Sequence, residues 1–320
     1  MAVYTKVSKK DLEELLAGYD VGKLEKFTAI AAGIQNSNYF IDTTKAKYVL
    51  TIYEDSVNDD DLPFFLGVMD HFAKHDVPCP LPIQNKGGEP LSKIKGKLCA
   101  IVSFVQGHED DVFTDAHIIA VGKNLAKMHL AGHDFTMQRE NDLSVGGWFD
   151  LFSKVKSRAD EFELGIAEEI DETLHMLKDK WPKDLPKGAI HSDLFPDNVL
   201  FNDDATIAGI IDFYFACSDF YMYDFAVCLN AWCFDEDYKF NKKKAKLLFD
   251  SYNAVRKVSD AEYDALPILA SGAAMRFFLT RIYDWLNRVE GVMLTPKAPL
   301  EYLQKLRFHL ADSNPKKYGF

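Results

Sequence analysis

The first hundred residues alternate short apolar runs with polar turns, which predicts a small antiparallel sheet. Strands are expected at "LEKFTAI" (24–30), "NYFID" (38–42) and "YVLTIY" (48–53), since these runs are rich in β-branched and aromatic residues. After the turn "NKGGEP", the apolar run 97–105 predicts a buried strand.

Two helices are expected within this part of the chain. Ser8 followed by Asp11 forms a capping-box pattern, and Gly18 closes the first helix. Residues 61–76 carry apolar side chains at spacings of three and four, which predicts a second helix.

From Thr114 onward the apolar periodicity is mostly helical. Helices are expected over 114–134, 161–181 and from residue 223 to the end, and short strands within 189–215 interrupt them. The change of pattern near 103–110 predicts two domains. We expect a nucleotide-binding sheet with one helix in residues 1–104 and a helical lobe with the catalytic loop and substrate site in residues 105–320.

Composition narrows the choice of function. The 320 residues are 48% hydrophobic and 27% charged, which is typical of globular proteins. The net charge of −12 argues against a nucleic-acid partner held through phosphates. The basic run "NKKKAK" (241–246) is interpreted as the start of a solvated helix.

The five cysteines indicate a cytoplasmic protein. Their odd number and the absence of a CxxC pair argue against a disulfide framework, so buried free thiols in a reducing compartment are expected. The N-terminus has no apolar signal region, and no run is expected to be long enough to span a membrane.

The candidate chemistry lies in "AIHSDLFPDNVLFNDDATIAGIIDFYF", residues 189–215. His191, Asp193 and Asn198 form H-x-D-x4-N, and a predicted hairpin then returns Asp212 toward Asn198. Amide and carboxylate oxygens suit Mg²⁺, and a carboxylate beside them can accept a hydroxyl proton. Phosphoryl transfer needs this combination. The alternative is structural, with Asp193 capping a turn and Asp212 ending a strand.

This stretch resembles the protein-kinase-like fold, with H-S-D in place of H-R-D and D-F-Y in place of D-F-G. The resemblance implies an α+β, two-lobe fold that uses ATP and Mg²⁺. It implies catalytic Asp193, a bracing His191, and metal ligands Asn198 and Asp212.

The same resemblance places the nucleotide site in the sheet domain. The strand lysine of the fold aligns with Thr51, so Lys45, Lys47 or a basic residue of the other lobe would have to replace it. The "AAGIQNSNYF" segment aligns with the position of the fold's glycine-rich loop. The "SFV" segment aligns with the junction of the two lobes, where kinases bind adenine. The expected ATP-binding residues are Gly33, Ser37, Thr51, Ser103, Phe104 and Val105.

Longer segments, including "HSDLFPDNVLF" and "AAMRFFLTRIYDW", resemble the homoserine kinases among the aminoglycoside phosphotransferase-like enzymes. The resemblance runs from about residue 28 to beyond 300 and is compatible with threonine at 51. It implies L-homoserine as the acceptor, a zwitterion whose carboxylate needs a cation. The expected substrate-binding residues are Asn36, Tyr214, Asn230, Trp232, Arg276 and Arg281.

Several alternatives remain open at this point. Each arginine could instead be a structural ion-pair partner, with Asp284 as a partner of Arg281. Asp224 is expected to support the catalytic loop, and His129 is expected to be a satisfied histidine without acidic company. A related kinase could act on choline, methylthioribose or an aminoglycoside, with "CFDEDY" (233–238) facing the cation. A non-catalytic pseudokinase is the alternative from another class.

Overall fold

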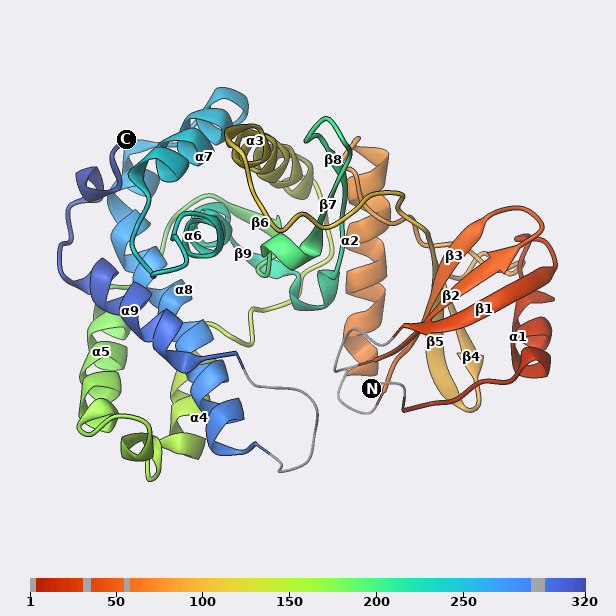
Figure 1. Cartoon of the computed structure of the whole chain (residues 1–320), viewed down its shortest axis with the longest axis horizontal. Coiled ribbons are helices and arrows are strands. Elements are labelled where there is room, and N and C mark those ends of the chain that lie inside the picture. Colours follow the sequence, from red (N-terminus) through yellow and green to blue (C-terminus); the bar gives the residue numbers. More distant parts are fainter. Residues whose placement is uncertain (1–3, 31–35, 55–57, 289–296) are drawn as a thin grey trace. The chain divides into compact units, whose positions relative to one another are not determined.

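The computed structural model describes residues 4–30, 36–54, 58–288 and 297–320, and these divide into two compact units (Figure 1). Unit 1 contains residues up to 108 together with 208–211. Unit 2 contains residues 109–207 and 212–320.

Unit 1 is built on an antiparallel sheet with the order β1-β2-β3-β5-β4. The three strands expected from the sequence are confirmed, and the strand expected over 97–105 ends at Ser103. Thr51 pairs with Asn38 on one side and Ala100 on the other. The strands are β1 Leu24–Ile30, β2 Ser37–Thr43, β3 Lys47–Ile52, β4 Leu91–Ile94 and β5 Lys97–Ser103.

Two helices accompany this sheet. Helix α1 (Lys9–Leu16) begins with the predicted capping box, in which the Ser8 hydroxyl accepts from the Asp11 N–H and the Asp11 carboxylate accepts from the Ser8 N–H. The buried leucines of α1 belong to one core cluster with apolar residues of β2, β3 and β5. Helix α2 (Leu62–Lys74) agrees with the predicted second helix.

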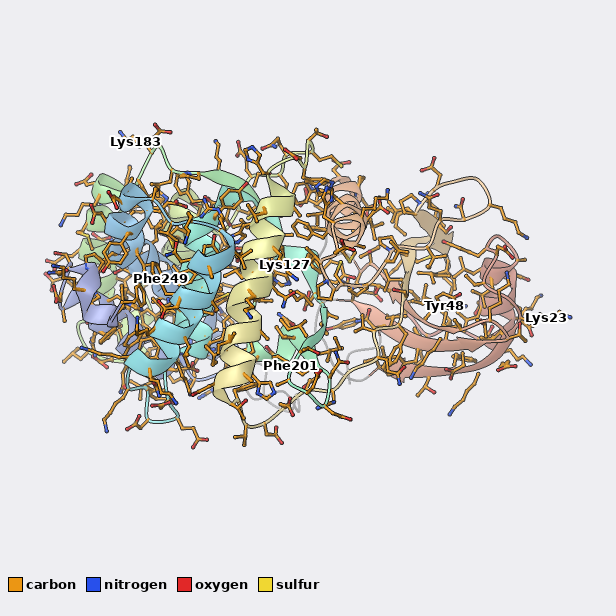
Figure 2. All side chains as sticks on the ribbon, turned by 90° about the horizontal axis from the view of Figure 1, so that it is seen from above. Lys23, Tyr48, Lys127, Lys183, Phe201 and Phe249 are labelled. Atoms are coloured by element: carbon orange, nitrogen blue, oxygen red, sulfur yellow. The ribbon has the colours of Figure 1, made fainter. Side chains whose placement is uncertain are left out.

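Unit 2 is mainly helical. Helix α8 packs against α4, α6 and α9. Helix α3, which carries Lys127, packs against α7, which carries Phe249 (Figure 2). The helices are α3 Asp115–Gly132, α4 Val145–Val155, α5 Ile166–Lys180, α6 Tyr221–Trp232, α7 Lys242–Val255, α8 Asp260–Leu286 and α9 Pro299–Leu310.

Two short sheets interrupt these helices, and the sequence predicts the second of them. Strands β6 (Lys187–Ile190) and β9 (Cys217–Phe220) pair antiparallel. Strands β7 (Val199–Phe201) and β8 (Ile207–Ile210) form the expected hairpin. The segment between β6 and β7, residues 191–198, is called the site loop below.

Helix α8 corrects the expectation that no run could span a membrane. It is long and apolar enough by length and composition, with a mean hydropathy of 1.3 over its most apolar window. However, 83% of that window is buried inside the protein, which identifies α8 as a core helix. All five cysteines are free and all but Cys79 are buried, as expected.

Four elements differ from the prediction for local reasons. Strands β4 and β9 and helix α4 were missed because they are short or carry glycine and polar residues within their apolar pattern. Helix α5 begins at Ile166 instead of 161, because Gly165 adopts a left-handed conformation (φ 84°) immediately before it.

Candidate active site

The site loop is held by one buried carboxylate. Asp224, on α6, is fully buried and accepts hydrogen bonds from the backbone N–H groups of His191 (2.9 Å) and Ser192 (2.7 Å). Ser192 has a positive φ of 65°, a conformation that costs energy for a residue other than glycine. The two hydrogen bonds to Asp224 stabilise this turn, so the expected supporting role of Asp224 agrees with its contacts.

His129 lies on the other side of Asp224, which corrects the expectation that this histidine lacks acidic company. Its Nε2 is 3.1 Å from the Asp224 carboxylate and its Nδ1 is 2.7 Å from the Tyr252 hydroxyl. Burial lowers the pKa of His129, so the neutral ring donates from Nε2 and accepts at Nδ1. Burial alone would raise the pKa of Asp224, but the hydrogen bond from His129 and the loop N–H groups lower it.

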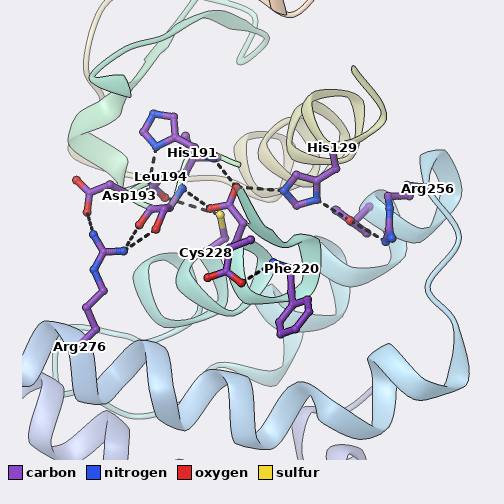
Figure 3. A network of polar contacts seen from close by, with 12 residues as sticks. His129, His191, Asp193, Leu194, Phe220, Cys228, Arg256 and Arg276 are labelled. Carbon is purple, nitrogen blue, oxygen red and sulfur yellow. Dashed lines mark hydrogen bonds and ion pairs between the residues drawn. The ribbon is translucent and has the colours of Figure 1, made fainter. Parts of the chain in front are cut away.

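Arg276 holds the site loop from the opposite side. Its guanidinium donates to the carbonyl and to the hydroxyl (2.7 Å) of Ser192 and lies 3.8 Å from the Asp193 carboxylate. Figure 3 shows Arg276 of α8 contacting the loop itself and His129 of α3 contacting the carboxylate that supports the loop. In the H-R-D motif the arginine at the position of Ser192 would supply a cation to the loop. In this chain Arg276 of α8 supplies a cation beside the loop instead.

Asp193 and Asn198, five residues apart in the site loop, lie together. The Asn198 amide donates from Nδ2 to the carbonyl (2.8 Å) and the carboxylate (3.3 Å) of Asp193. The backbone N–H of Asp193 donates to His191 Nδ1 (3.2 Å), which fixes the loop. The predicted bracing by His191 agrees with this contact.

The hairpin returns Asp212 to the neighbourhood of Asp193, and the two carboxylates repel each other. Burial raises the pKa of Asp193 to about 6. Burial and the Asp193 charge raise the pKa of Asp212 to about 6. Asp212 also has a positive φ of 65°. A buried carboxylate whose pKa is raised by a second carboxylate indicates a place suited to a cation.

The donor chemistry fits Mg²⁺. Because Asn198 uses its Nδ2 toward Asp193, its Oδ1 is the atom that could face a cation together with Asp212. Within the described ranges no group of three His, Cys, Asp or Glu side chains forms a metal site. A divalent ion here would therefore rely on two or three protein oxygens and on phosphate oxygens, as Mg²⁺ commonly does.

The residues predicted to bind substrate have other contacts. The Arg281 guanidinium pairs with Glu301 (2.6 Å) instead of Asp284. The buried Asn230 amide bonds to the carbonyls of Ala226 and Ala270 and to His309. The indole of Trp232 donates to the Leu194 carbonyl (2.9 Å), which supports the site loop. The Tyr214 N–H donates to Asp212. Their roles toward substrate stay predictions.

The glycine-loop residues in unit 1 are only partly described. Gly33 lies outside the described residues. The hydroxyl of Ser37 is buried, donates to Glu54 (2.5 Å) and accepts from the backbone of Tyr4 and Thr5. Asn36 is buried and its Oδ1 accepts from the Glu54 N–H (3.3 Å). These contacts order the end of β3, and phosphate binding by Ser37 stays a prediction.

The segment predicted to bind adenine follows β5. Ser103 is bonded to Leu81 through its N–H and its hydroxyl, whereas Phe104 and Val105 are half-buried. Of the lysines considered for the phosphates, Lys45 pairs with Asp20 (2.7 Å) and the Lys47 ammonium lies over the rings of Phe40 and Phe104.

Comparison with known sequences gives a match across the whole chain. The profile of the phosphotransferase enzyme family matches residues 26–258. The chain is 51% identical to a homoserine kinase of Xanthobacter autotrophicus and 50% identical to one of Rhodospirillum rubrum. Both alignments cover 100% of this chain and 99% of the relative.

Comparison with solved structures identifies the fold. An amicoumacin kinase superposes with a TM-score of 0.70 at 13% identity, covering 95% of this chain and 92% of its own. A spectinomycin phosphotransferase superposes with a TM-score of 0.68 at 15% identity, covering 99% and 98%. The protein-kinase-like fold predicted from the sequence is confirmed.

The raised pKa of Asp212 predicts a pH-dependent stability in the metal-free protein. The Asp212 carboxyl has a pKa of about 6 in the folded protein and about 3.9 in the unfolded chain. The folded state therefore binds more protons than the unfolded state at pH values between these two pKa values. Its free energy of unfolding therefore falls as pH rises through this window. We expect Asp212→Asn to be more stable than the wild type at pH 8 by roughly 1–3 kcal/mol, with no difference at pH 4.

Thermal unfolding in EDTA measures this difference, and asparagine also tolerates the positive φ. Asp264→Asn, on the exposed side of α8, is the matched control and should show no pH-dependent gain. Equal melting temperatures of wild type and Asp212→Asn at pH 8 would contradict the prediction.

Arg276→Met should lower kcat by about 10–100-fold and leave the KM for ATP unchanged, since a charged hydrogen bond is worth about 1.5–3 kcal/mol. Removal of the cation also raises the pKa of Asp193, so the acidic limb of the pH–rate profile should move to higher pH. An ATP-consumption assay across pH measures both. A loss of activity with an unmoved limb would indicate a packing role only.

Proposed function

Because the chain belongs to the homoserine kinases of the phosphotransferase enzyme family, we propose that it transfers the γ-phosphoryl group of ATP to the side-chain hydroxyl of L-homoserine. The observation that carries the proposal is the match to homoserine kinases over the full length of the chain. The reaction belongs to the route to threonine, and we propose that it takes place in the cytoplasm.

The site loop supplies the chemistry of this proposal. Asp193 accepts the hydroxyl proton of the acceptor, and its pKa of about 6 leaves it ionised at neutral pH. Asn198 and Asp212 would hold Mg²⁺, which neutralises the charge of the ATP phosphates. Arg276 keeps the Asp193 carboxylate oriented and ionised. Asp224 stabilises the backbone conformation of the loop.

In unit 1, we propose that backbone groups at Ser103, Phe104 and Val105 bind the adenine. Thr51 stands in the sheet where the fold usually places a lysine, so another cation must contact the phosphates. Lys47 is the candidate that is not paired with a carboxylate among the described contacts, since its ammonium lies over aromatic rings.

A choline-like or aminoglycoside acceptor is less well supported. Such cations need free carboxylates or open aromatic faces. In the stretch 233–238, Asp235 pairs with Lys244 (2.9 Å) and Asp237 pairs with Lys239 (2.6 Å). Neither pair includes a residue of the site loop, where the acceptor hydroxyl has to reach Asp193.

The purified protein with Mg²⁺·ATP should release ADP with L-homoserine at a kcat/KM at least tenfold above that with choline, methylthioribose or kanamycin. A coupled ADP-release assay measures each rate. A higher kcat/KM with one of the other acceptors would identify that acceptor as the substrate in place of homoserine. The absence of acceptor-dependent ADP release would favour a pseudokinase.

Asp193→Asn should lower kcat by about 10²–10⁴-fold, the usual worth of a general base, with little change in the KM for either substrate. Steady-state kinetics at pH 8 measure this effect. Asp264→Asn, on the exposed side of α8, compares the loss of one negative charge without loss of the proposed base. A kcat for Asp193→Asn near that of the wild type would remove Asp193 from the mechanism.

A further inference from the structure

The acceptor proposed above is a zwitterion, and its carboxylate needs a cation near Asp193. The two arginines predicted for this task have structural partners. Arg276 donates to Ser192 within the site loop, and Arg281 pairs with Glu301 at the start of α9. The substrate carboxylate therefore needs another basic residue near the site loop.

Lys297 is such a residue. It precedes α9 and its ammonium lies 3.2 Å from the carboxylate of Asp197, which is in the short 3₁₀ turn Pro196–Asn198 of the site loop. The same ammonium lies 5.5 Å from the ring centroid of Phe195. This pair joins segments 100 residues apart directly beside the proposed base and metal ligand.

The pair is open to a ligand. The side chains of Lys297 and Asp197 are 63% and 56% exposed. An ion pair this exposed contributes little to stability, so opening it costs the protein little. The buried pairs of unit 2, such as Arg256 with Glu262, offer no such access, because those side chains are 10% and 1% exposed.

The pair also lies beside the base in the site loop. Asp197 directly precedes Asn198, whose amide donates to the Asp193 carboxylate (3.3 Å). A molecule bound between Lys297 and Asp197 would therefore lie next to the residue that contacts the base.

We propose that Lys297 and Asp197 exchange their mutual ion pair for the two charges of the acceptor. Lys297 binds the α-carboxylate and Asp197 binds the α-ammonium. The two methylene groups between the α-carbon and the hydroxyl then reach from this pair to the Asp193 carboxylate. This inference rests on the proposed function and assigns the recognition of the amino-acid head group to two named residues.

The test pairs two variants with two truncated acceptors. 3-Aminopropan-1-ol lacks the carboxylate of homoserine, and 4-hydroxybutanoate lacks its ammonium. Lys297→Met should lower kcat/KM for homoserine by about 10–100-fold, mainly through KM, and leave that for 3-aminopropan-1-ol unchanged. Asp197→Asn should lower kcat/KM for homoserine in the same way and leave that for 4-hydroxybutanoate unchanged. The KM for ATP should stay constant.

Lys243→Met is the matched control, because Lys243 forms a similarly exposed pair with Asp115 elsewhere in unit 2. Where a truncated acceptor is turned over too slowly, its competitive inhibition constant against homoserine gives the same comparison. An equal loss with homoserine and 3-aminopropan-1-ol in Lys297→Met, or no loss, would overturn this inference alone. Absence of homoserine turnover by the wild type would overturn the proposed function and this inference together.

Discussion

The site depends on the hydrogen bonds between the buried Asp224 carboxylate and two successive N–H groups of the site loop. Those bonds hold Ser192 in a left-handed turn that its side chain disfavours. The His129 ring also contacts this carboxylate, and both side chains are fully buried. The loop is thus shaped by the core of unit 2, and the catalytic candidates take their positions from it.

The protein gives up stability at this site. Asp193 and Asp212 are held close together with raised pKa values, and Asp212 has a positive φ. Arg276 offsets only part of the repulsion, since it lies 3.8 Å from one carboxylate. The negative charges of such a site are balanced when a divalent ion and its phosphates are bound. This accords with a function in phosphoryl transfer.

Much of this arrangement could be predicted from the sequence, because its signals are local. The hairpin that brings Asp212 back follows from apolar runs and a turn, and the capping box at Ser8 is a four-residue pattern. The partners of Arg276 and His129 could not be predicted, because 84 and 95 residues separate them from their contacts. An arginine in an apolar helix indicates a buried partner but not which one.

The Arg276 guanidinium that bonds to Ser192 belongs to α8, which comes late in the chain, whereas the site loop ends at residue 198. During synthesis, a ribosome-bound chain would carry the whole H-S-D sequence long before its guanidinium partner emerges. The site loop therefore gains its contact with Arg276 only after α8 has been synthesised and has docked.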